Sequence, residues 1–114
     1  MTQDPRRELS VPLPAVVRHP DGSLRNEYVV NVSVSGLCLH MRSPVSIGEQ
    51  LWVAFRLPEQ ADAIHASCKV LWTSHEGEVQ PVPRFFETGL FVLDLSEADR
   101  QRIEAFVFAQ VDRR

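Results

Sequence analysis

A short polar segment at residues 31–36 carries the residue types best suited to hold a ligand. Its sequence is Asn-Val-Ser-Val-Ser-Gly, and it lies between two runs of alternating apolar residues. Asn and Ser side chains hydrogen-bond either nearby backbone or a bound molecule, and glycine lets a backbone or a ligand approach closely. The segment therefore indicates either a ligand-binding turn or a turn whose polar side chains satisfy its own backbone.

Two consecutive arginines near the N-terminus, Arg6 and Arg7, carry charge suited to the same site. A guanidinium donates paired hydrogen bonds to guanine O6 and N7 or to phosphate oxygens, and it also stacks on a purine face. A basic arm folded over Asn31, Ser33 and Gly36 would therefore suit a guanine nucleotide with phosphates. On residue types alone, the alternative of a solvated arm beside a self-satisfied turn is favoured.

The remaining polar residues do not form a catalytic or metal-binding pattern. The histidines are scattered, without the i, i+4 spacing of a helical metal site: His19, His40, His65 and His75. Cys38 and Cys68 lie in separate apolar runs without a CxxC spacing, so we expect free, buried thiols. The glycines are isolated and form no phosphate-binding loop. We predict no enzyme, no catalytic residues, no metal site and no cofactor.

Length and charge narrow the class of protein further. A chain of 114 residues is one domain by length. Its net charge of −3 argues against a general nucleic-acid binder. No stretch is apolar enough for a signal peptide or a membrane span, so we expect a cytoplasmic location without membrane insertion.

Alternating apolar residues predict six strands. They run from near Ala15, after Pro12 and Pro14, and then over about 28–32, 37–42, 50–57, 63–73 and 88–94. Three strands have clear inward-facing sets: Leu37, Leu39 and Met41; Leu51, Val53, Phe55 and Leu57; and Ile64, Ala66, Cys68, Val70 and Trp72. Residues 74–85, with a glycine and two prolines, form a long loop between the fifth and sixth strands.

The apolar period then changes to that of a helix over residues 97–111. Ser96 with Asp99 three residues later resembles an N-cap followed by an acidic first turn. The apolar stripe consists of Ile103, Phe106, Val107 and Val111. The pattern predicts an all-β domain with one helix, a small antiparallel barrel whose open end is covered by that helix. Residues 1–10 form a flexible arm, and 11–114 form the domain.

The order of these features resembles the PilZ domain family. That family carries an RxxxR motif in an N-terminal arm and a [D/N]xSxxG motif between two strands, followed by a six-stranded barrel and a C-terminal helix. Residues 31–36 match the second motif at each defined position. Later segments also fit: Lys69-Val70-Leu71-Trp72 and Gly89-Leu90-Phe91 before the helix. The resemblance implies a cyclic di-GMP ligand, with Arg6, Arg7, Asn31, Ser33 and Gly36 as binding residues.

One motif position departs from the family. With Arg6 as the first motif arginine, the second is Ser10; with Arg7 as the first, it is Val11. Serine has neither the charge nor the reach of arginine. Losing one charged bidentate contact at a buried site costs on the order of 2–5 kcal/mol, a factor of roughly thirty to several thousand in affinity.

Two functions therefore remain open. One is an adaptor in cyclic di-GMP-linked signalling, with weak or absent nucleotide binding, that acts on motility, type IV pili or related surface behaviour. The other is a functional cyclic di-GMP receptor that uses the five residues above, in which the ligand orders the arm. Either way, a single domain without an output module acts through a protein partner, whose identity the sequence does not reveal.

Overall fold

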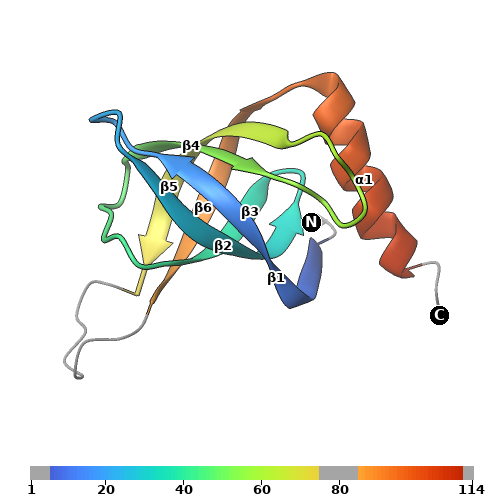
Figure 1. The fold of residues 1–114 in the computed structure, drawn as a ribbon, viewed down its shortest axis with the longest axis horizontal. Helices are drawn as coiled ribbons and strands as arrows, with labels where there is room; N and C mark the ends of the chain where they lie inside the picture. The colour runs from blue at the N-terminus through green and yellow to red at the C-terminus, as the bar shows by residue number, and fades with distance from the viewer. Residues whose placement is uncertain (1–5, 75–84, 112–114) are drawn as a thin grey trace, which may run out of the picture.

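Six antiparallel strands close into a barrel, and one helix lies at one end of it (Figure 1). A computed structural model describes residues 6–74 and 85–111. The elements are β1 (Arg6–Arg18), β2 (Leu24–Ser33), β3 (Gly36–Met41), β4 (Gln50–Phe55), β5 (Ile64–Thr73), β6 (Phe86–Leu95) and α1 (Glu97–Val111). Around the barrel the strands follow the order β1-β2-β3-β6-β5-β4, with β1 paired to β4 to close it. The predicted fold class is confirmed.

The barrel interior is filled by the alternating apolar residues of each strand. The predicted inward sets of β3 and β4 are all buried, as is Leu57 just beyond β4. Alternation places these side chains on one face because successive residues of a strand point to opposite sides. No helix in the described part of the chain is long and apolar enough to cross a membrane.

The helix begins where the sequence predicts. The backbone N–H of Asp99 donates to Ser96 Oγ at 3.1 Å, which is the predicted N-cap. Ile103 and Val107 are buried in the core and Phe106 packs against it, whereas the side chain of Val111 lies outside the described residues. Arg102 then ties α1 to the β4–β5 loop through Gln60 Oε1, at 2.9 Å from its Nε, and through the Asp62 and Ala63 carbonyls.

The first strand starts earlier than the sequence predicted. Residues 6–10 belong to β1 in this structure, although a flexible arm was expected over 1–10; residues 1–5 lie outside the described part. They form strand because Arg6, Arg7 and Glu8 pair with the last residues of β2. The register of the β1–β2 pairing then shifts between Glu8 and Leu13. Pro12 and Pro14 therefore lie inside β1, after its first paired residues, and do not precede the strand.

One predicted inward residue, Trp72, points outward. The pairing of β5 with β6 shifts between Val70 and Trp72, so that Val70 lies opposite Leu90 and Trp72 lies opposite Gly89. The extra residue of this bulge reverses the alternation. Thr73 is consequently buried against Thr88, with the two hydroxyls 3.3 Å apart, and Trp72 is 46% exposed.

Candidate functional site

A row of residues on the outer surface of the barrel crosses four neighbouring strands. Asn31 of β2 is the register partner of Cys38 in β3, Cys38 is that of Gly89 in β6, and Gly89 is that of Trp72 in β5. A shift in the β2–β3 pairing between Val29 and Asn31 turns Asn31 to this side. The two bulges therefore place the Asn31 amide at one end of this row and the Trp72 indole at the other.

The middle of this row is the floor of a groove of about 430 Å³. The floor is recessed because Cys38 has a small side chain and Gly89 has none. The Trp72 ring lies directly on Gly89: a Cβ added there would be 2.1 Å from Trp72 Nε1 and 2.4 Å from Cε2. Leu71 and Phe91 extend the apolar wall beside Trp72. We name this hollow, lined also by Arg6, Asn31 and Gly36, the motif groove.

Arg6 lies at the polar end of the motif groove. It pairs with Ser33 across the β1–β2 ladder, is exposed, and is the one arginine among the described residues that line this groove. Asn31, also in the lining, is half-buried, and its amide has no hydrogen bond to any described residue. A guanidinium and an uncommitted amide thus face the groove opposite an aromatic wall, which suits a planar, hydrogen-bonding, anionic ligand.

Arg7, the other predicted arginine, is not at the groove. Its Nη1 donates to the carbonyl oxygen of Phe106 in α1 at 3.1 Å, and its guanidinium carbon lies 4.1 Å from the Phe106 ring centroid. The cause is strand alternation, because Arg6 points outward and its neighbour must point inward. In this structure Arg7 is therefore a contact between β1 and the helix.

Ser33 and Gly36 serve the turn between β2 and β3. Ser33 Oγ accepts from the Gly36 N–H at 3.0 Å and donates to the Gly36 carbonyl at 3.1 Å, and Ser33 is buried. Gly36 allows a close approach to β6, since a Cβ there would lie 3.1 Å from the Leu90 carbonyl oxygen, a tight contact. Ser33 thus hydrogen-bonds the backbone of its own turn, which is one of the two alternatives for this segment. Ser33 and Gly36 nevertheless form part of the groove lining.

The two thiols differ in exposure. Burial raises the pKa of the Cys38 thiol above its usual value, and the negative charge of Glu87 acts in the same direction. Complete burial raises the pKa of Cys68 to about 12. Cys38 is half-buried at the groove and Cys68 lies in the core. Among the described residues, no three His, Cys, Asp or Glu side chains are grouped as a metal site would require.

Sequence reasoning missed the aromatic wall. Trp72 was assigned to the inward face because unbroken alternation was assumed through β5, and Phe91 was named only within the segment 89–91 that fits the family pattern. The signal that was available is Gly89, a glycine inside a strand, which marks a bulge or the close approach of another group. Here the group that approaches is the Trp72 ring.

We predict that Gly89→Ala moves Trp72 out of the groove wall. The new methyl group would overlap three indole atoms within 2.8 Å, so the ring must rotate. In a Trp52→Phe background, where Trp72 is the sole tryptophan, its fluorescence maximum should shift by several nanometres. Gly36→Ala, whose methyl meets the Leu90 carbonyl instead, is the matched control. An unchanged Trp72 spectrum in Gly89→Ala would contradict the placement of the ring.

Comparisons with known proteins agree with this fold. The PilZ domain family model matches residues 2–109. The Bacillus subtilis inhibitor of motility, MotI/DgrA, superposes with a TM-score of 0.78 at 18% identity, covering 100% of this chain and 53% of that one. The PilZ domain of Escherichia coli YcgR, solved with cyclic di-GMP, gives 0.72 at 12% identity, covering 95% and 89%. K. pneumoniae MrkH in complex with cyclic di-GMP gives 0.74 at 18%, covering 97% and 52%.

These structures share the fold of this chain, which spans about half the length of MotI and MrkH. None of the curated proteins matches the sequence. The family model, in contrast, covers nearly the whole chain, including the arginine pair, the polar segment at 31–36 and most of the helix. The chain belongs to the PilZ domain family.

Proposed function

We propose that this domain is a regulator in cyclic di-GMP-linked signalling that acts by contacting a protein partner and binds the nucleotide weakly. Its family and three structural neighbours linked to cyclic di-GMP or motility support the signalling role. The observation that carries weak binding concerns the arginines at the motif groove: among the described residues Arg6 alone lines it, Arg7 is bonded to α1, and Ser10 stands at the second motif position.

The ligand chemistry still fits the groove. Arg6 would hold a phosphate or the guanine edge, the Asn31 amide would hydrogen-bond a base or ribose group, and a purine would stack against Trp72. With one guanidinium instead of two, we expect a dissociation constant on the order of 100 µM or weaker. The domain would then act mainly through surfaces that do not depend on the nucleotide.

Titration calorimetry with cyclic di-GMP tests the proposal directly. A weak heat of binding that Arg6→Ala abolishes would support the proposal. Arg25→Ala, which changes a distant exposed arginine, is the control and should leave the heat unchanged. A dissociation constant below about 1 µM would overturn weak binding and favour the second candidate, a functional receptor. That candidate is favoured by one observation, the Arg6, Asn31 and Trp72 side chains already gathered around one groove.

Cys38 provides a second readout that detects weak occupancy. We expect a maleimide to label Cys38 more slowly than a free cysteine at pH 8, because its raised pKa leaves less thiolate. Cyclic di-GMP at millimolar concentration should slow this labelling in proportion to occupancy, while cyclic di-AMP slows it less. Cys68, fully buried, is the internal control and should react only on unfolding. Equal labelling of Cys38 with and without nucleotide would contradict binding in the motif groove.

A further inference from the structure

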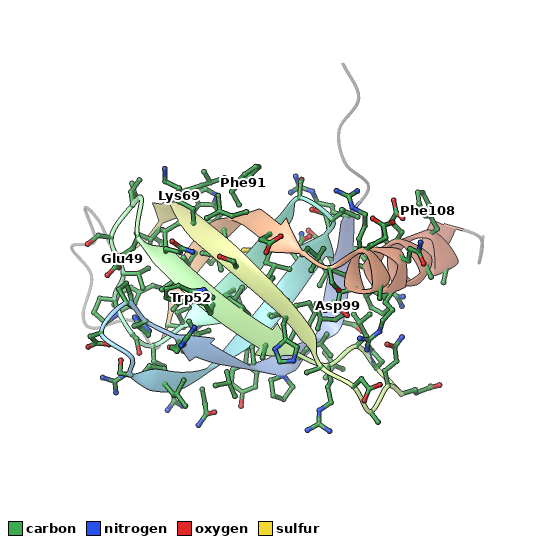
Figure 2. The ribbon with its side chains drawn as sticks, turned by 90° about the horizontal axis from the view of Figure 1, so that it is seen from above. Glu49, Trp52, Lys69, Phe91, Asp99 and Phe108 are labelled. Carbon is green, nitrogen blue, oxygen red and sulfur yellow. The ribbon has the colours of Figure 1, made fainter. Side chains whose placement is uncertain are left out.

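A second groove lies beside the motif groove, between β6 and α1. It measures about 510 Å³ and shares Ser35 and Phe91 with the motif groove as lining residues. Its apolar part comes from Phe91, Leu93 and Phe108, which are 44%, 48% and 47% exposed. Figure 2 shows Phe91 and Phe108 projecting from the same side of the molecule, one from the barrel and one from the helix. We name this hollow the helix groove.

Charges of both signs line the helix groove next to its apolar residues. Arg100 and Glu104 lie one turn apart on α1, and Asp94 is at the end of β6. None of the three forms an ion pair within residues 6–74 and 85–111. Arg102, by contrast, is paired with Asp99 at 2.9 Å on another side of the helix. The helix groove thus combines exposed apolar side chains with unpaired charges of opposite sign.

This combination is self-complementary. A two-fold contact uses the same patch on both copies, so each charge must find its opposite within that patch. An axis passing between residues 100 and 104 would set two α1 helices antiparallel. Arg100 of one copy would then face Glu104 of the other, and the reverse pair would form at the same time. A patch of a single sign could not make this contact, because like charges would repel across the axis.

The exposed apolar area of the helix groove determines how strong a dimer contact is expected. Phenylalanine side chains carry roughly 150–250 Å² each and leucine no more, so two phenylalanines and a leucine that are nearly half exposed present at most roughly 200–350 Å². A stable interface buries roughly 800 Å² on each partner. The apolar residues therefore account for less than half of such an interface, and the charged rim must supply much of the rest. The expected result is a weak dimer.

We propose that the helix groove is the contact surface of a homodimer, held by Phe91, Leu93 and Phe108 and by two reciprocal Arg100–Glu104 ion pairs. The contact needs no nucleotide, so it does not depend on the function proposed above. Its dissociation constant should be on the order of tens to hundreds of micromolar.

Sedimentation equilibrium without nucleotide tests the proposal through a charge exchange. Arg100→Glu and Glu104→Arg should each raise the dimer dissociation constant at least tenfold, because each creates two like-charge contacts across the axis. The double variant Arg100→Glu/Glu104→Arg restores opposite charges and should return within about threefold of the original value. Arg25→Glu, a charge reversal at the far end of the barrel, should change nothing.

Phe108→Asp is the second, independent variant. This exposed residue lies in the helix groove and outside the buried core, so the domain should fold, as circular dichroism would show, and remain monomeric. Two results would overturn the proposal. One is an unmodified domain that stays monomeric at about 500 µM, which would mean that the helix groove binds another protein or no protein. The other is a double variant no better than the single ones.

Discussion

Replacing Ser10 with arginine is expected to tighten cyclic di-GMP binding by at least about thirtyfold. Ser10 is exposed on β1, four residues after Arg6 and on the same side of the strand. It also lies in the stretch between Glu8 and Leu13 where β1 is not in register with β2, so this segment has room to adjust toward the groove. A second guanidinium would restore the paired, charged contacts that the family motif supplies.

Calorimetry on three variants separates the causes of such a gain. Ser10→Lys adds the charge without the planar fork and should recover only part of the affinity. Val16→Arg adds an arginine at the other end of β1, where Val16 is exposed, and should have no effect. If Ser10→Arg bound no more tightly than the unmodified domain, the serine would not be the cause of weak binding, and the arm would not bring position 10 to the ligand.

The second large effect is expected from Glu27→Gln, which should lower the free energy of unfolding by about 2–3 kcal/mol. Glu27 is only 2% exposed, and its carboxylate accepts the backbone N–H groups of Arg42 at 2.7 Å and Ser43 at 3.3 Å. It thereby ends β3 and fixes the start of the following loop. Glutamine keeps the size but replaces one acceptor with an NH₂ group that faces a donor, and a buried donor without a partner is costly.

Urea denaturation measures this loss, and Glu49→Gln is its matched control. Glu49 Oε1 also accepts a backbone N–H, that of Ser46 at 2.9 Å, but in an exposed turn where water replaces the bond. We expect a change below about 0.5 kcal/mol there. Equal losses in the two variants would show that burial of the Glu27 carboxylate contributes nothing to stability.

Alternation of apolar residues was sufficient to predict the barrel and its helix. Leu37, Leu39 and Met41 are buried as expected because the extra residue of the β2–β3 shift lies in β2, so the alternation of β3 itself is unbroken, and β3 pairs with β6 without a shift. The boundaries of β1 were harder to predict, since its N-terminal part is polar and pairs only because the end of β2 lies alongside it. Such pairing is a tertiary effect that composition alone does not reveal.

The directions of the side chains around the candidate site were predicted in part, and the two that were not predicted share one cause. Arg6, Asn31 and Gly36 line a common groove. The sequence analysis did not predict that Arg7 contacts α1 or that Trp72 lines the groove, because the direction of a strand side chain depends on parity, and one bulged residue reverses it. Alternation counted from an outward-facing Arg6 predicts that Arg7 points inward. For the bulge before Trp72, the one indication in the sequence is Gly89, a glycine inside a strand.

The opposite directions of Arg6 and Arg7 would let a ligand in the motif groove act on α1 through β1. A ligand that draws Arg6 away from its present place also pulls on the hydrogen bond from Arg7 to Phe106. Part of the binding free energy would then be used to loosen α1, and by thermodynamic reciprocity a partner that holds α1 in place would weaken ligand binding by the same factor. Hydrogen exchange of the α1 amides with and without cyclic di-GMP measures this coupling, and identical exchange would show that it is zero. The first two described residues would thus connect a nucleotide surface to a protein surface within one peptide unit.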